Sequence, residues 1–364
     1  MPTTRMIRLS SLAVLGLFAA ACESSTGPVI DLDFAAASAD YEVVDSIFAT
    51  PAWSGFQALG TRTPFGVSPA ALEAVSSLDG AARGNGRSFA LQLARRMHDA
   101  VLSGGRPAMT PIISNTHRGE TFVYVPALDE YAVDSTRTGA PATGVRFVVY
   151  EVDSAGIPIV TEEIGYADLI DEGDTSAEDV ALRLVVVANS VTVLDYATTL
   201  DLGLVQGTLT VDGFVQGANG VRLDFAIEAV GTHFVNYSTL DLNFDLAVDA
   251  RDFSITGEVV GVREGVEGEG DVDLTVQHRS HSVRLDVNGS AGILDGSVFV
   301  DGQLFATIDG PAATPTILSA DGDALTTAEV LVLHHIVDVV EDIFDFLEDL
   351  VDPVDEIVIL GVIL

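Results

Sequence analysis

Histidine and carboxylate side chains are the groups of this sequence that could do acid–base or metal chemistry. His278 and His281 are three residues apart, a spacing that places them on opposite faces of a strand but lets them converge across a turn. No third ligand lies nearby in the sequence, so a zinc site is only a weak hypothesis. A hydrolase would require two or more of His233, His278, His281 and acidic residues to converge in one cleft, and the G-x-S-x-G motif is absent.

One acidic stretch supplies the candidate metal ligands, and we expect it to be a loop between two strands. Oxygen-rich loops bind Ca²⁺, but the ordered D-x-D-x-D-G pattern is absent there and at Asp321–Asp323. We therefore expect no required cofactor. Ca²⁺ stays as an alternative, in which the protein is a calcium-stabilised surface module. The weak candidate ligands are Asp168, Asp171, Asp174, Glu178 and Asp179.

The composition excludes several chemistries. All 17 basic residues are arginine, so the chain lacks the lysine of Schiff-base enzymes and of phosphate-binding loops. Its one cysteine, Cys22, leaves no disulfide and no cysteine-based zinc site. The formal net charge of −37 opposes binding to nucleic acid and to anionic lipid surfaces.

The amino terminus has the three parts of a secretory signal peptide. Arg5 and Arg8 precede an apolar run over residues 9–21, which is shorter than the ~20 residues of a membrane-spanning helix. Three alanines, Ala19–Ala21, then lead into Cys22. We therefore expect this segment to direct secretion and to be removed.

The Ala-Ala-Cys sequence after a Phe/Leu-rich core resembles the lipobox of bacterial lipoproteins. The resemblance implies that residues 1–21 are a lipoprotein signal peptide, that Cys22 is acylated and that residues 22–30 are a tether. By the same resemblance, Glu23 implies an outer-membrane location, facing the periplasm or the cell surface. Plain secretion is the alternative, because Ala19 and Ala21 also suit an ordinary signal peptidase.

Residues 31–119 read as an N-terminal loop and helical region. A stretch with Trp53 suggests loop with short elements, and two helices are expected after Ser68, the second over residues 87–102. From Arg62 to Arg118 there are seven arginines and only three acids, whereas no basic residue follows Arg284. We predict that the arginine-rich part lies near acidic surface of the same chain.

Residues 120–310 change to a period of two, which indicates strands with one buried and one wet face. Leu240–Val248 is the clearest case, and Asn219-Gly220 and Asp301-Gly302 are typical of tight hairpin turns. The regular spacing predicts an antiparallel meander of roughly ten strands. The expected fold is mainly β with helices (α+β): an open or half-barrel sheet covered by a C-terminal amphipathic helix and by the N-terminal helical segment.

Residues 311–364 are expected to hold that helix and a terminal strand. Thr326 or Thr327 can cap the helix, with Glu329 close behind, and an apolar stripe runs on to Leu350. The opposite face carries acids without Lys or Arg, which favours packing on the sheet over binding to a membrane surface. The apolar residues 357–364 are too few to span a membrane, and we predict that they form a strand.

These patterns favour a non-catalytic, membrane-anchored envelope lipoprotein with a binding or structural role. A curved sheet with a covering helix is similar in architecture to lipoprotein carriers and lipocalin-like folds, which implies a lipid or other hydrophobic ligand between sheet and helix. The expected partners are thus the membrane, through the N-terminal lipid, and a hydrophobic molecule, but not nucleic acid. The alternatives are an envelope hydrolase that uses carboxylate and histidine residues, and the calcium-stabilised module.

Overall fold

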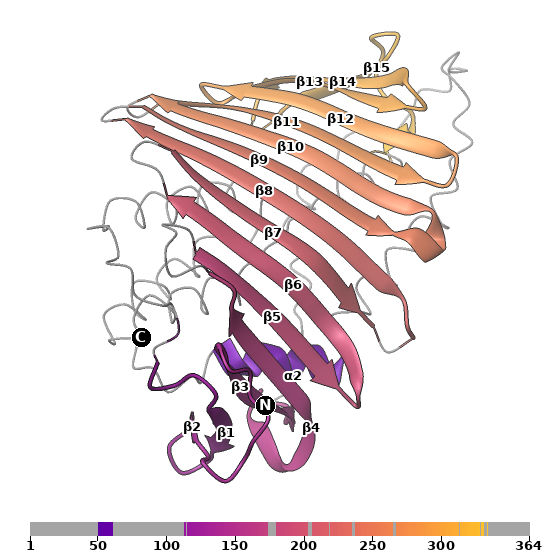
Figure 1. Ribbon diagram of the computed structural model, residues 1–364. Helices are drawn as coiled ribbons and strands as arrows, with labels where there is room; N and C mark the ends of the chain where they lie inside the picture. The colour runs from indigo at the N-terminus through magenta and orange to yellow at the C-terminus, as the bar shows by residue number, and fades with distance from the viewer. Residues whose placement is uncertain are drawn as a thin grey trace.

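The chain forms one open β-sheet, which Figure 1 shows as a continuous layer of strands. The computed structural model describes residues 50–60, 113, 115–173, 180–202, 206–217, 219–234, 237–264, 267–312, 314–327, 329–330 and 333. Fifteen strands lie in the order β15-β14-β13-β12-β11-β10-β9-β8-β7-β6-β5-β4-β3-β1-β2. From β3 onward each strand therefore pairs with the next one in the sequence, as a meander requires.

The strands of the first half are β1 (Thr121–Val125), β2 (Glu130–Val133), β3 (Gly144–Val152), β4 (Pro158–Asp171), β5 (Val180–Ala188), β6 (Val191–Leu202) and β7 (Gln206–Gln216). Those of the second half are β8 (Arg222–Phe234), β9 (Tyr237–Val248), β10 (Phe253–Glu264), β11 (Glu267–His278), β12 (His281–Ser290), β13 (Ile293–Val300), β14 (Gln303–Pro311) and β15 (Thr316–Ser319). A 3₁₀ turn, η1 (Asp249–Arg251), joins β9 to β10.

Strict alternation along the central strands gives the sheet an apolar face and a polar face. On β9, Leu242, Phe244 and Leu246 are buried, whereas Asn243 and Asp245 between them are exposed. Antiparallel register places apolar residues opposite apolar residues, as in Leu242 opposite Val259 and Ala229. The apolar side therefore forms one core cluster that extends from β2 to β11.

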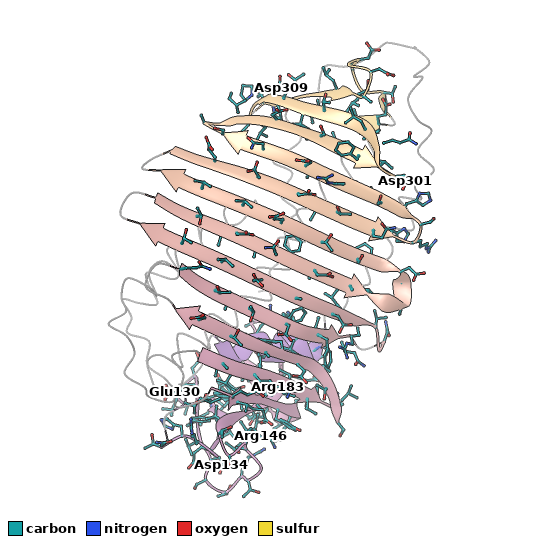
Figure 2. The ribbon with its side chains drawn as sticks, turned by 45° about the horizontal axis from the view of Figure 1, so that its top comes forward. Glu130, Asp134, Arg146, Arg183, Asp301 and Asp309 are labelled. Carbon is teal, nitrogen blue, oxygen red and sulfur yellow. The ribbon has the colours of Figure 1, made fainter. Side chains whose placement is uncertain are left out.

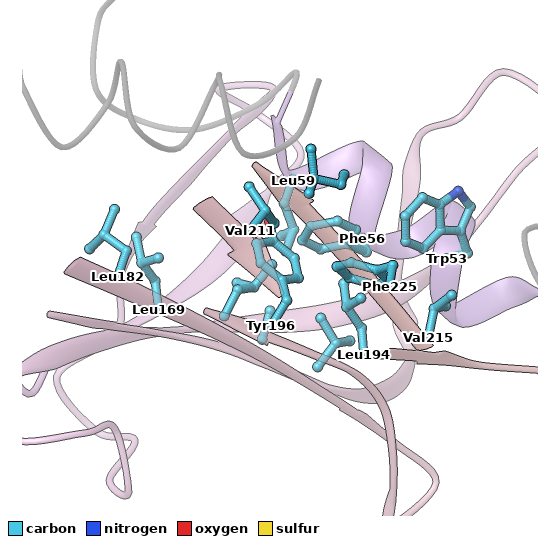
Figure 3. Close-up of a cluster of buried hydrophobic side chains, with 14 of the residues drawn as sticks. Trp53, Phe56, Leu59, Leu169, Leu182, Leu194, Tyr196, Val211, Val215 and Phe225 are labelled. Atoms are coloured by element: carbon cyan, nitrogen blue, oxygen red, sulfur yellow. The ribbon is translucent and has the colours of Figure 1, made fainter. Parts of the chain in front are cut away.

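Helix α2 (Pro51–Gly60) packs on the apolar face at the β3 end of the sheet. Thr50 begins it as an N-cap, because its Oγ1 accepts a hydrogen bond from the Trp53 N–H at 3.2 Å, and Pro51 suits the first helical position. Gly55 lets the helix approach the sheet closely, since a Cβ there would lie 2.5 Å from the carbonyl oxygen of Tyr150. Figure 3 shows Phe56 and Trp53 facing the core side chains of the sheet.

The two outer strands of the sheet, β2 and β15, are only four residues long. A bridge between Leu318 and Ala324 also covers part of the β15 edge. Short or covered edges leave few unpaired backbone groups for another chain to join. The open sheet thus offers its faces rather than its edges for contact.

The predicted β-meander is confirmed in outline, with three differences. There are fifteen strands rather than about ten, and β1 pairs with β3 in parallel, so the sheet is mixed. The sheet also passes the predicted boundary at residue 310, because β15 adds Thr316–Ser319. The helices predicted between residues 68 and 102 and the terminal strand at 357–364 lie outside the described residues.

The start of the predicted C-terminal helix falls within the described residues. Glu329 and Thr326 form a reciprocal capping box: the Thr326 N–H donates to Glu329 Oε2 at 2.7 Å, and the Glu329 N–H donates to Thr326 Oγ1 at 3.3 Å. Leu333, one turn further on, is buried against Val283 and Val298 of the apolar face. The cap is thus confirmed at Thr326, while residues 334–364 lie outside the described part.

Candidate functional site

The polar face of the sheet is the large exposed surface of the described chain. Figure 2 shows it facing the viewer, with oxygen-tipped side chains along the strands and α2 on the far side. Register partners on neighbouring strands lie directly opposite each other. Side chains on this face therefore form rows that cross the strands. The chemistry of the face therefore depends on which polar residues the register brings together.

Cross-strand ion pairs lie on both sides of the middle of this face. Arg183 of β5 donates two hydrogen bonds of 2.8 Å to Asp195 of β6, and this contact raises the pKa of the Arg183 guanidinium. On the other side, Arg284 of β12 donates to Asp273 of β11 at 2.6 Å and to Asp286 at 3.2 Å. The hydrogen bond to Asp273 likewise raises the pKa of Arg284.

Two further arginines on the sheet are fixed by an aromatic ring as well as a carboxylate. Arg146 lies 3.7 Å over the ring of Tyr166 and binds both oxygens of Asp168, at 2.6 and 2.7 Å. Arg222 lies 3.8 Å over the ring of Phe214 and pairs with a neighbouring aspartate on its own strand. A guanidinium held on both sides is preorganised and is not available to a ligand.

Between these ion pairs the polar face is hollowed. The hollow has a volume of about 580 Å³ and crosses β7, β8, β9, β10 and β11. We call it the acidic trough. The lining side chains on the polar face form two rows across the strands. One row is Thr210, Glu228, Asn243, Glu258 and Asp273, and the other is Asp212, Ala226, Asp245, Thr256 and Thr275.

Four carboxylates of the trough, those of Asp212, Glu228, Asp245 and Glu258, are exposed and have no ion pair within the described part of the chain. Asp212 and Asp245 are separated by one strand, as are Glu228 and Glu258, which places each pair about 10 Å apart. The described residues contain no group of three or more His, Cys, Asp or Glu that could hold a metal ion.

Two of the five candidate metal ligands lie on a strand rather than in a loop. Asp168 and Asp171 belong to strand β4, and both are held by arginines: Asp168 by Arg146, and Asp171 by Arg118 at 2.6 Å. Strand β4 thus extends into the stretch that was predicted to be a loop. Asp174, Glu178 and Asp179 lie outside the described residues, as does Cys22, so calcium binding and lipidation stay predictions.

The arginine-rich segment was predicted to lie near acidic surface of its own chain. Arg118, at the end of the segment and outside the predicted helix, joins the buried Asp171 through its guanidinium and also donates to the Ile113 carbonyl at 3.1 Å. The other six arginines of the segment lie outside the described residues. The prediction for the segment as a whole therefore stays untested.

His278 and His281 meet across a turn rather than along a strand. They are register partners that close the β11–β12 hairpin, which places their side chains on the same face. His278 is buried beside the ring of Phe253, whereas Nδ1 of His281 lies 2.9 Å from Oδ2 of Asp301 in the next hairpin. This hydrogen bond lowers the pKa of the Asp301 carboxyl. The side chain of His233 and residues 334–335 lie outside the described part.

The apolar side offers little preformed space near α2. A void between α2 and strands β5–β7, lined by Trp53, Phe56 and Leu194, has a volume of about 10 Å³. That is about the smallest space that holds one water molecule, far less than an acyl chain needs.

Among the described helices, none has the length and apolar character needed to cross a membrane.

Comparison with known proteins brings no relative. No protein-family model, no curated protein and no solved structure matches the chain. The argument for function therefore rests on the residues and their geometry. The acidic trough itself was missed by sequence reasoning, although the alternating acids of β8, β9 and β11 were visible; the strand register was the missing information.

Proposed function

We propose that this chain is a lipid-anchored, non-catalytic envelope protein whose one-sided sheet serves as a binding or structural module. The observation that carries the proposal is the division of the sheet into a buried apolar face and an exposed polar face with a hollow of about 580 Å³. The lipobox-like sequence at Cys22 supports the anchor. An enzyme is not favoured, since His281 is engaged by Asp301 and His278 is buried beside Phe253.

The anchor is tested by replacing Cys22 with serine. Wild-type protein should partition with membranes and incorporate labelled palmitate, whereas Cys22→Ser should enter the soluble fraction without label. Thr26→Ala in the tether is the matched control and should leave both properties unchanged. Membrane association of unlabelled Cys22→Ser would show that the attachment has another cause.

We further propose that the segment after Thr326 continues as an amphipathic helix over the apolar face, and that a hydrophobic ligand would lie between them. The capping box and the burial of Leu333 support this arrangement. Native mass spectrometry of the full chain, extracted from its own membranes, should reveal a bound lipid. Recovery of the protein without any bound lipid would leave the binding role to the polar face.

A further inference from the structure

The polar face of the sheet has no partner within the described chain, and its charge is arranged unevenly. Carboxylates on both sides of the middle of the face, such as Asp195 and Asp273, are bound by arginines, whereas the four acids inside the trough are not. The hollow thus gathers four carboxylates that have no ion pair in the described chain, although unpaired acids such as Asp295 and Asp309 also lie elsewhere on the face.

From this arrangement we propose that the acidic trough is the docking surface for a partner polypeptide segment in extended conformation, with arginine or lysine at alternate positions. Charge complementarity selects the partner, because the lining contains five acids and no basic residue. Anionic partners are repelled, and so is the same face of a second copy of this chain.

The two rows of the trough match two successive same-side side chains of an extended segment that runs parallel to the strands. These rows lie two residues apart along each strand, which is about 7 Å, and side chains on one side of an extended peptide recur at the same interval. Ala226 lies between the two acids of the second row and Thr256 lies beside Asp245; both are short and leave room for longer side chains from the partner.

The thermodynamics of such docking are also favourable on this protein's side. The four carboxylates are exposed, so they can meet a cation without a large loss of their own hydration. They project from strands that are hydrogen-bonded on both sides, which keeps the backbone beneath them rigid before binding. The cost of ordering therefore falls mainly on the partner segment.

The test measures binding of two fluorescein-labelled peptides to the full chain in detergent by fluorescence anisotropy. In one peptide arginine alternates with glycine, and in the other glutamine replaces every arginine. The trough variant carries Glu228→Gln and Glu258→Gln. The control variant carries Asp295→Asn and Asp309→Asn, an exposed register pair on the same face that changes the net charge equally.

The control pair lies outside the electrostatic range of the trough. Asp295 on β13 is three strands from Glu258 on β10, or about 14 Å, and charges are screened beyond about 8 Å at physiological salt. We expect the arginine peptide to bind wild type and control within about twofold, and the trough variant about tenfold more weakly. The glutamine peptide should bind none of them.

Three results would overturn the proposal. Equal weakening in both variants would show that the peptide responds only to the net charge of the chain. Unchanged binding in the trough variant would place the contact elsewhere, and equal binding of the glutamine peptide would remove the role of charge. The docking surface does not depend on the lipid anchor, so a failure of the Cys22→Ser experiment leaves this test intact.

Discussion

A glycine on the apolar face, directly behind the acidic trough, gives the sharpest test of the fold. Gly257 of β10 is the register partner of Phe244 of β9, and the Phe244 ring covers it. A Cβ at position 257 would lie 2.1 Å from Cζ of that ring, so any side chain must displace it. Phe244 is 4% exposed and belongs to the core cluster, which leaves the ring little room to move.

The magnitudes follow from this contact. Gly257→Val should lower the free energy of unfolding by about 2 kcal/mol through overpacking, and Phe244→Ala should lower it by about 3–4 kcal/mol through the loss of a buried ring. In the double variant the valine occupies space that the ring has left. The combined loss should therefore be about 1–2 kcal/mol smaller than the sum of the single losses.

Urea denaturation followed by far-UV circular dichroism measures all three variants against wild type. A loss of about 2 kcal/mol corresponds to a midpoint shift of about 1 M urea. Gly261→Val, on the same strand and with no atom nearer than 4.0 Å to its added Cβ, is the matched control and should change the midpoint little. Additive losses, or equal losses at positions 257 and 261, would refute the packing argument.

Three further predictions concern single contacts. Asp168→Asn should lower the free energy of unfolding by about 2 kcal/mol, because the half-buried Arg146 loses a bidentate charged partner; chemical denaturation measures this. NMR titration should show the pKa of the Asp301 carboxyl below its ordinary value, and His281→Ala should raise that pKa, because the hydrogen bond from the imidazole is lost. Because the pKa of the Asp301 carboxyl is lowered in the folded protein, the hydrogen bond stabilises the fold at pH values above the usual aspartate pKa. This stabilisation is lost as the pH falls through the lowered pKa of Asp301. Thr326→Ala should lower the free energy of unfolding by about 1 kcal/mol through loss of the helix cap, measured by denaturation against Thr327→Ala.

Strands with one wet face could be predicted from the sequence, and strands with two apolar faces could not. β9 alternates strictly, so its bounds were close to those observed. β5 is a nearly continuous run of apolar residues, VALRLVVVA, and a run without alternation carries no period-two signal. Such a run is one reason why the predicted strand count was too low.

The candidate site depended on information that alternation does not contain. The alternation of β8 and β11 showed which side chains share a face, but the opposing residue on the next strand depends on exact turn lengths, and a shift of one residue reverses the faces. Asp301-Gly302 was recognised as a turn, and both residues have positive φ, 51° and 74°. Asn189 and Ser190 also have positive φ without a glycine, so their turn left no clear signal.

The acids of the trough reduce the stability of the sheet that carries them. Glu258 lies directly opposite Asp273, and Asp273 opposite Asp286, an arrangement of like charges that is destabilising across strands. Arg284 relieves Asp273 and Asp286 but does not bind Glu258. Glu258→Gln should therefore raise the free energy of unfolding by a few tenths of a kcal/mol, and Asp273→Asn should lower it by about 0.5 kcal/mol because Arg284 loses its partner.

Opposite signs for these two neighbouring substitutions, measured as shifts of the urea midpoint, would show that the trough charge opposes folding. A surface that lowers stability is expected where it serves binding rather than the fold. If Glu258→Gln instead destabilised the protein, Glu258 would have a structural role, and the case for a docking surface would lose its energetic basis. The same Glu258→Gln protein can be used in both measurements, so gain of stability and loss of peptide binding can be compared directly in one variant.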